Sequence, residues 1–444
     1  MRTLSAAVAA LLLATFAVAA DEPKLTDAPR PPDGFPAFKV QEIDAGLKIG
    51  YAVITADLDG DAKPDVVVVD QHKVVWYQNP TWKKRVILDG KTEKDNVCVT
   101  ALDIDGDKLP ELVLGAGWKP ADTKTPGTLQ WLKRGKTLDD EWTVHPIPCD
   151  EPTVHRVRAI DLDGDGKPEV VMAPLHGRDC TAKGNYTDGR PVRIVGYKVP
   201  AKDPEKKESW KPEVLSEELF VVHNFCEVRS AEVNRPTLFA TSYDGLHTLT
   251  RDSERKWVTA RVGEGDQTNP KGSRGASEVA GGEMEQWELT KSDMLNVFRY
   301  PDKFVATVEP WHGNAVAVYT RKGNWGEGKA WERVVIDDKL RWGHAVKFAN
   351  LDPPPVRGSH TRTDTLIVGV RDNPTKGDTF TEKRGVRLYR RDAKGLKWER
   401  YILEDGGVAV EDLTVADLNA DGKPDIVAVG RATGNARIYW NLGK

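Results

Sequence analysis

A repeated acidic turn between two strand-like segments constrains the fold of this chain more than any other feature. Each unit reads as a β-strand, a tight turn rich in Asp and Gly, and a second strand rich in β-branched residues. Four clear copies are DLDGDAKPDVVVV from Asp57, DIDGDKLPELVLG from Asp103, DLDGDGKPEVVMA from Asp161 and DLNADGKPDIVAV from Asp417. Aligning their second strands reveals three degenerate copies, EVRSAEVNRPTLFATS, EVAGGEMEQWELTKSDMLNVF and AVKFANLDPPPVRG. Seven units at this spacing are typical of propeller blades.

A second periodic marker agrees with the first. An outer strand that begins with Trp recurs as WKKRVI, WTVHPI, WKPEVL, WVTARV, WERVVI and WERYIL, and the seventh is missing at the C-terminus. FKVQEI, residues 38–43, has the same pattern near the N-terminus. We therefore predict an all-β seven-bladed β-propeller over residues 35–444, in which the N-terminal strand completes the last blade and closes the ring. The alternative, two separate β-sandwiches, leaves FKVQEI unexplained.

The two ends of the chain and its charge narrow the cellular context. Residues 1–20 combine one Arg, a short apolar run and small residues, which predicts a signal peptide and a secreted or periplasmic protein. A Pro-rich segment, residues 21–34, follows. The formal charge is −4 and no Lys/Arg cluster is interleaved with aromatics, so nucleic acid is not an expected partner. No later segment is apolar enough for a membrane span.

The acidic turns predict structural Ca²⁺ sites. Carboxylates at positions 1, 3, 5 and 9 of a Gly-containing loop direct hard oxygen ligands at one centre. The pattern resembles the FG-GAP or VCBS repeats of integrin-like propellers, and it lacks the final Glu of an EF-hand. The alternative is a solvated turn without metal. The predicted ligands are Asp57, Asp59, Asp61 and Asp65; Asp103, Asp105, Asp107 and Glu111; Asp161, Asp163, Asp165 and Glu169; and Asp417, Asn419, Asp421 and Asp425.

The opposite face of the ring is where we expect the chemistry. Strands of a blade alternate in direction, so the start of strand one and the turn joining strands two and three lie on the same face. At the first of these positions stand His155, His223, Glu278, His344 and Glu411. The second set lies on loops of a rigid scaffold, where binding residues are usual. It comprises His176, Arg178, Tyr243, Glu309, Trp311, His312, Asn314 and Arg371.

Imidazoles and carboxylates at one mouth suggest a divalent metal with open coordination positions. A histidine there is suited to proton abstraction near neutral pH. No G-x-S-x-G elbow or phosphate-binding glycine loop is present. The pattern therefore favours metal-assisted removal of a proton next to a carbonyl or carboxylate, followed by loss of a β-substituent. That is lyase chemistry.

Three segments carry a family resemblance. GASEVAGGEM, FVATVEPWHGNAVAVYTR and RWGHAVKFANLD resemble the propeller domain of the aldos-2-ulose dehydratases, also called anhydrofructose dehydratases. The resemblance implies β-elimination of water from a keto-sugar of the anhydrofructose, aldosulose or 3-keto-glycoside type. It also implies a divalent metal (Zn²⁺, Mg²⁺, Mn²⁺ or Ca²⁺) at the channel mouth, which would polarise the sugar carbonyl. A small carbohydrate is then the expected substrate.

The resemblance and the histidine positions together suggest roles. His155 is the expected base, His223, His344 and Glu278 are expected to bind the catalytic metal, and His312 belongs to the catalytic group. The second set, with Glu411, would hold the sugar. Two alternatives remain open: a polysaccharide lyase acting on uronic acids, and a non-catalytic, calcium-stabilised propeller that binds carbohydrate or protein.

Overall fold

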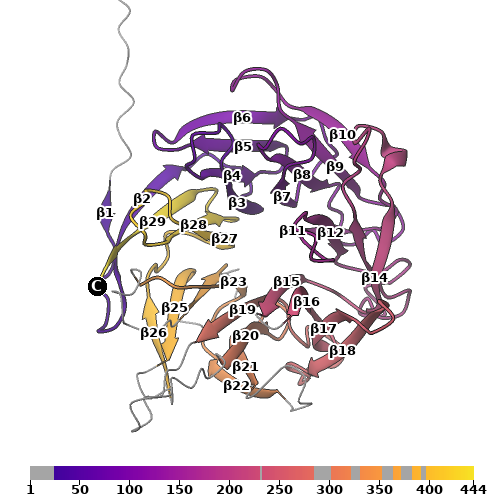
Figure 1. Cartoon of the computed structure of the whole chain (residues 1–444). Coiled ribbons are helices and arrows are strands. Elements are labelled where there is room, and N and C mark those ends of the chain that lie inside the picture. Colours follow the sequence, from indigo (N-terminus) through magenta and orange to yellow (C-terminus); the bar gives the residue numbers. More distant parts are fainter. Residues whose placement is uncertain are drawn as a thin grey trace, which may run out of the picture.

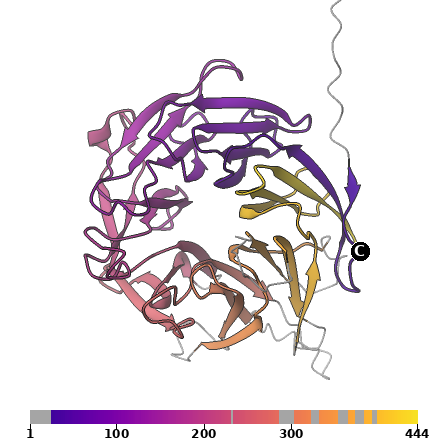
Figure 2. The ribbon, with the colours of Figure 1, turned by 180° about the vertical axis from the view of Figure 1, so that it is seen from behind.

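The computed structural model describes residues 25–230, 233–284, 302–321, 331–352, 364–371, 383–391 and 397–444. Seven antiparallel sheets are arranged as a ring around a central channel, seen from its two faces in Figures 1 and 2. The predicted seven-bladed β-propeller is confirmed. The predicted signal peptide, residues 1–20, lies outside the described residues.

Six blades are built from four consecutive strands each, running from the channel outward. Their bounds are β3 Ala52–Ala56, β4 Asp65–Val69, β5 Lys73–Gln78 and β6 Lys83–Asp89; β7 Cys98–Leu102, β8 Glu111–Ala116, β9 Thr128–Lys133 and β10 Thr143–Ile147; β11 Val154–Ile160, β12 Glu169–Pro174, β13 Val192–Tyr197 and β14 Pro212–Leu219; β15 Asn224–Ser230, β16 Val233–Ser242, β17 Gly245–Arg251 and β18 Trp257–Gly263; β19 Val279–Met284, β20 Asp302–Glu309, β21 Ala315–Arg321 and β22 Glu332–Asp337; β23 Gly343–Ala349, β24 Thr365–Val370, β25 Gly385–Arg391 and β26 Trp398–Ile402. A short 3-10 turn, Lys207–Ser209, precedes β14.

The seventh blade joins the two ends of the chain. It contains β27 Val410–Ala416, β28 Asp425–Gly430 and β29 Ala436–Gly443, and its outer strand is β2 Ala37–Asp44. β2 pairs antiparallel with β29, with Val40 opposite Tyr439, and the short β1, Thr26–Asp27, pairs with β2. The FKVQEI segment therefore lies in the last blade, beside the C-terminal strand in Figure 1.

The second strand of each repeat is apolar because it is covered on both faces. Every residue of β4 and β8 is buried. Val67 of β4 packs in one cluster with Leu112 and Leu114 of β8, so the core lies between neighbouring blades. This burial on both faces explains the continuous Val, Ile and Leu runs of the repeat.

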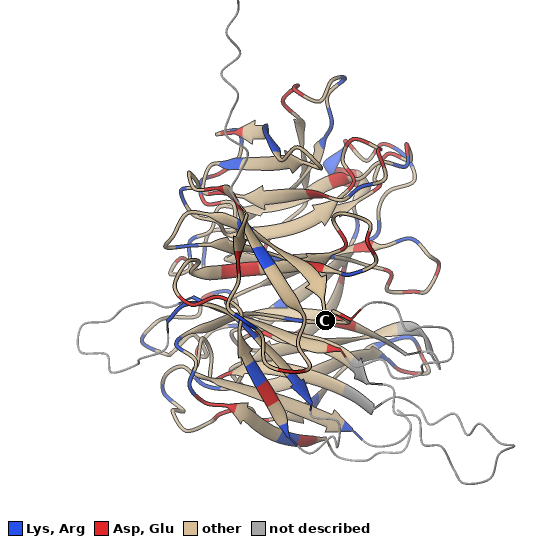
Figure 3. Cartoon of the chain, turned by 90° about the vertical axis from the view of Figure 1, so that its left-hand side faces the viewer, with Lys and Arg blue, Asp and Glu red and all other residues tan. Residues whose placement is uncertain are grey.

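Charges of both signs are mixed on the part of the surface that Figure 3 presents, where Lys and Arg are interspersed with Asp and Glu. Among the described residues, no helix is long and apolar enough to cross a membrane.

Candidate active site

The mouth of the central channel holds a cavity of about 360 Å³. Strand-start residues from six blades line it, namely Tyr51, Val97, His155, His223, His344 and Glu411. Turns joining second and third strands contribute His176, Tyr243, Trp311, His312, Arg371 and Arg431. Members of both predicted sets of residues therefore meet in one place.

β-Bulges direct three of these side chains. The pairing of the first and second strands shifts register at His155 in β11, at His344 in β23 and at Glu411 in β27. A bulge leaves one residue outside the ladder and re-aims its side chain. The same irregularity in three blades thus places the repeat position at the channel mouth.

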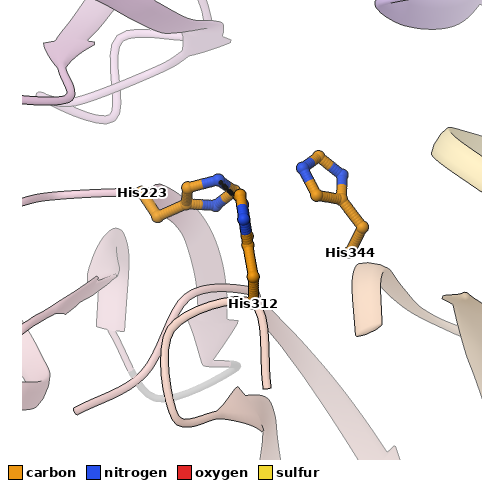
Figure 4. Close-up of side chains that lie close together, drawn as sticks. All are labelled: His223, His312 and His344. Atoms are coloured by element: carbon orange, nitrogen blue, oxygen red, sulfur yellow. Dashed lines mark hydrogen bonds between the residues drawn. The ribbon is translucent and has the colours of Figure 1, made fainter. Parts of the chain in front are cut away.

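Three imidazoles converge at the centre of the cavity. His223, His312 and His344 come from separate blades and point toward one another in Figure 4. One ring nitrogen from each lies within 4.8 Å of the others. The Nε2 atoms of His223 and His312 are 2.7 Å apart. Among the described residues, this group is the one at the mouth that could hold a metal ion.

Glu278 lies behind His223 and is not a member of that group. Its Oε1 atom is 2.8 Å from Nδ1 of His223, although the two groups are not aligned for a full hydrogen bond. Asn224 donates to the other carboxylate oxygen at 2.5 Å. Burial raises the pKa of Glu278 to about 7, and Arg156 opposes that effect. We predicted Glu278 as a metal ligand, whereas the structure places it where it can orient His223.

Glu411 organises the other side of the site. Its carboxylate accepts hydrogen bonds from Arg371 at 3.0 Å and from Arg431 at 2.8 Å. Its backbone carbonyl accepts one from Nδ1 of His344 at 2.5 Å. Nε2 of His344 is therefore left to face the cavity, and Arg371 also contacts Nδ1 of His312 at 3.3 Å.

His155 is held in one tautomer. Its Nδ1 lies 2.9 Å from the carbonyl oxygen of His223, so Nδ1 carries the proton and donates it. Nε2 then carries the lone pair, which accepts a hydrogen bond from Nη1 of Arg156 at 3.1 Å. The ring also lies against Trp118, with the centroids 4.8 Å apart.

The site keeps its histidines neutral. Burial holds the pKa values of His155, His223, His312 and His344 well below the ordinary value, and nearby charges on Arg156, Arg371 and other histidines act in the same direction. A neutral imidazole can bind a metal or accept a proton.

Aromatic rings form part of the cavity wall. His176 stacks on Tyr186 with the ring centroids 3.8 Å apart and an interplanar angle of 2°. His312 stacks on Trp311 at 3.9 Å. Among the described residues, the buried indole N–H of Trp311 has no hydrogen-bond partner. Burial lowers the pKa of His176 to about 4.

Three predicted substrate-binding residues do not line the cavity. Glu309 is fully buried inside blade five, where it accepts from Arg333 and Tyr319. Arg178 donates to the carbonyl oxygens of Lys124 and Asp150. Asn314 donates to the carbonyl of Asp338 at 3.0 Å. All three brace the loops that carry the site.

The turn after Glu309 shows why a His-Gly pair is needed. His312 has a positive φ of 52°. A Cβ at Gly313 would lie 2.2 Å from the carbonyl oxygen of Glu309, so the turn closes only with glycine there. The result projects His312 toward the channel.

Sequence reasoning missed three aromatic residues of the cavity, Trp118, Tyr186 and Trp342, and the charged residue Arg156. Trp118 follows the second strand of its blade, the position already considered in other blades, so the repeat alignment could have found it. Arg156 and Trp342 adjoin strand-start histidines. Tyr186 lies in a loop between β12 and β13 that the repeat does not contain, so no periodic signal marks it.

The acidic turns lie at the other end of the first strands. In the first turn, Asp57 accepts the N–H groups of Gly60 and Ala62, and the buried Asp65 accepts that of Leu58. Equivalent bonds occur in the other three turns. Carboxylate oxygens lie within 4.8 Å of one another in three groups, which are Asp57, Asp59 and Asp61; Asp103, Asp105 and Glu111; and Asp161, Asp163 and Glu169.

Solved structures share the fold. BBS1N, from a crystal structure of its complex with ARL6DN, has a TM-score of 0.50 and 11% identity, covering 90% of this chain and 95% of that one. The RRP9 WD40 repeats have a TM-score of 0.50 and 10% identity, covering 94% and 100%. At such identities the similarity concerns the fold alone.

Sequence comparisons find similar proteins, and one matched region includes residues of the candidate active site. Residues 57–114 match the family of FG-GAP-like repeats. Aldos-2-ulose dehydratase from Phanerodontia chrysosporium is 25% identical over 221 residues, which cover 48% of this chain and 22% of that protein. Residues 126–322 match the family described as aldos-2-ulose dehydratase, beta-propeller domain, and include His155, His223 and His312. The predicted resemblance is confirmed: over its middle blades, this chain is similar to the β-propeller domain of aldos-2-ulose dehydratase.

Proposed function

We propose that this protein is a metal-dependent carbon–oxygen lyase that removes water from a small keto-sugar by β-elimination. The observation that carries the proposal is the convergence of His223, His312 and His344 in a cavity beside a fourth, neutral histidine. The similarity to a dehydratase propeller supports the same reaction class.

The three converging imidazoles fit a divalent metal. Nδ1 of His223 lies beside the Glu278 carboxylate, and Nδ1 of His344 lies beside the backbone carbonyl of Glu411. Metal-binding histidines usually have such a partner at the nitrogen that does not bind the metal. With three protein ligands, an ion keeps an open position. For Nε2 of His312 to bind the metal, Nδ1 of the same ring must carry the proton. Arg371, which contacts Nδ1 in this structure, would then have to turn away from that atom toward Glu411. When bound, the metal would supply a Lewis acid for the sugar carbonyl.

His155 is the proposed base. His155 lines the cavity, and the low pKa keeps its ring neutral at physiological pH. Its Nε2 atom carries the lone pair, so Arg156 would have to turn from Nε2 when the substrate binds. Nε2 would take the proton from the carbon next to the carbonyl. The imidazolium that forms can return the proton to the departing hydroxyl, so that water leaves.

The walls of the cavity suit a single sugar. The stacked His176 and Tyr186, with Trp118, offer flat faces for a pyranose ring, while the indole N–H of Trp311 is available to a hydroxyl. A volume of about 360 Å³ is at the small end for ligand sites. This volume favours a small keto-sugar over a polymer. Arg371 and Arg431, which a uronate would need, are already hydrogen-bonded to Glu411.

We also propose Ca²⁺ in the acidic turns and export of the protein. The three groups of converging carboxylates, and the repeat-family match at residues 57–114, support the structural ions. Residues 1–20, with their short apolar run, support a secreted or periplasmic location.

The test is a direct assay. Purified protein is mixed with 1,5-anhydrofructose, and separately with a 3-keto-glucoside, while ultraviolet absorbance of a conjugated enone is followed. We expect absorbance to grow, and to be lost after chelation and in His155→Ala. A matched control, His145→Ala, removes a histidine that stacks on Trp131 outside the cavity and should retain activity. No absorbance change with either substrate, from folded and metal-loaded protein, would contradict the proposal.

A further inference from the structure

The central channel contains a second cavity beyond the histidine site. Its volume is about 270 Å³, and it is lined by the first strands of blades three to seven, further toward the acidic turns. Arg158, Lys347 and Asp412 face it, together with Asn224 and Glu278. The proposed reaction uses none of the first three side chains.

The charged groups of this cavity are incompletely paired. Arg158 donates to Oδ1 of Asn224 at 3.1 Å. Asp412 accepts the backbone N–H groups of Val53 and Leu413, each at 3.0 Å. No hydrogen bond or ion pair within 4.0 Å joins the Lys347 ammonium to any residue that the structure describes. Leaving an ammonium group without a partner inside a protein is costly unless something else solvates it.

Two cations, Arg158 and Lys347, line the cavity together with three carboxylates, Asp412, Glu278 and Glu227. Glu278 is matched by Arg156, whose Nη2 lies 3.5 Å from it. Asp412, which is half-buried like the two cations, is then the remaining carboxylate inside the channel for Arg158 and Lys347. Glu227 also borders the cavity, but it is exposed, where water and salt screen its charge. Burial and the charge on Arg158 lower the pKa of Lys347, while Asp412 and Glu278 oppose that effect.

The rest of the lining is apolar. Phe225, Val279, Ala280, Val346 and Phe348 border the same space. An occupant should therefore combine one negative charge with a short hydrocarbon part. This combination separates a carboxylate from inorganic anions of similar size.

We propose that this cavity binds a small aliphatic monocarboxylate, with its oxygens between Lys347 and Arg158 and its carbon chain against the apolar residues. The carboxylate would accept hydrogen bonds from an ammonium and a guanidinium group, the strongest donors available in a protein. The lining of this cavity contains none of the three clustered histidines, although it shares Glu278 and Asn224 with the surroundings of His223, and the proposal does not depend on lyase activity.

The test measures binding to the full chain without any turnover. Trifluoroacetate is titrated with protein by ¹⁹F NMR at constant ionic strength, and propionate, phosphate and chloride are added as competitors. We expect saturable binding that propionate displaces and chloride does not. Lys347→Met should weaken binding by about tenfold or more, because it removes a charged donor. Lys256→Met, at an exposed lysine, should bind as the parent does.

Two results would overturn the proposal. One is the absence of saturable binding, or equal binding by Lys347→Met. The other is displacement by phosphate or chloride as efficient as by propionate, which would show a general anion site. If Lys347→Met does not fold, Arg158→Met provides the same comparison, since it removes the other donor.

Discussion

Glu278 affects the proposed metal site through His223. The carboxylate lies at Nδ1 of that ring, with Asn224 on its other oxygen. Such outer partners orient a ligand and increase its basicity. Glu278 should therefore increase the affinity of the site for metal strongly, although it acts through His223 and not as a ligand.

We expect Glu278→Gln to weaken metal binding by about 10- to 100-fold, the usual effect of losing an outer partner. The measurement is a Zn²⁺ and Mn²⁺ titration against a competing chelator. Glu227→Gln changes an exposed carboxylate of the same channel and serves as the matched control. Equal affinities for the two variants would show that Glu278 does not support His223.

The four site histidines should make stability depend on pH. Their pKa values are held well below the ordinary value in the folded protein, while in the unfolded chain they titrate near about 6.5. Below that pH the unfolded chain binds more protons, so the free energy of unfolding decreases as pH falls. We expect the Tm of chelator-treated protein to decrease between about pH 7 and pH 5.

Variants separate this effect from general acid sensitivity. His344→Asn should show a shallower loss of Tm on acidification than the parent. His72→Asn, at an exposed histidine, should follow the parent. An unchanged slope in His344→Asn would contradict the assignment.

Each acidic turn joins the first two strands of a blade, so the charges in the turn bear on the stability of that blade. Burial and neighbouring carboxylates raise the pKa values of Asp65 and Asp425 to about 7. Bound Ca²⁺ would offset that repulsion. We expect Ca²⁺ at 100 times its Kd to stabilise the fold by about 2.7 kcal/mol per site, measured by thermal unfolding with and without EGTA.

Stoichiometry provides the control for the calcium prediction. The double variant Asp57→Asn and Asp59→Asn should bind one Ca²⁺ fewer by elemental analysis, with the other turns unaffected. Protein that holds no Ca²⁺ and has the same Tm with EGTA would show that the turns are solvated and metal-free.

The turn between β20 and β21 shows how far a local pattern can be interpreted. The sequence places Glu309, Trp311, His312 and Asn314 together, and it predicts a catalytic role for His312 and substrate binding for the other three. The structure divides them: Trp311 and His312 line the cavity, while Glu309 pairs with Arg333 inside the blade. Adjacent residues point in different directions because of the positive φ at His312, which spacing in sequence does not reveal.

At the scale of the whole molecule, the N-terminal strand holds the ring closed. Phe38 of β2 is 3% exposed and packs in a cluster with Ile367 of blade six and Ile426 of blade seven. We expect Phe38→Ala to lower the free energy of unfolding by about 3–5 kcal/mol, measured by urea denaturation. Leu25→Ala, at a side chain that is 51% exposed, should have little effect. A loss no larger than that of the control would mean that β2 does not secure the ring.

The number of blades, the N-terminal origin of the last outer strand and the face on which the histidines gather could all be predicted from the amino-acid sequence. They could be predicted because repeat position and strand direction are local, periodic properties. Which side chains meet is known from the three-dimensional structure alone. The bulges at His155, His344 and Glu411, the position of Glu278 behind His223 and the partly paired cavity at Lys347 all depend on how five first strands converge on one channel. These contacts join residues far apart in the chain, so no spacing within one repeat encodes them.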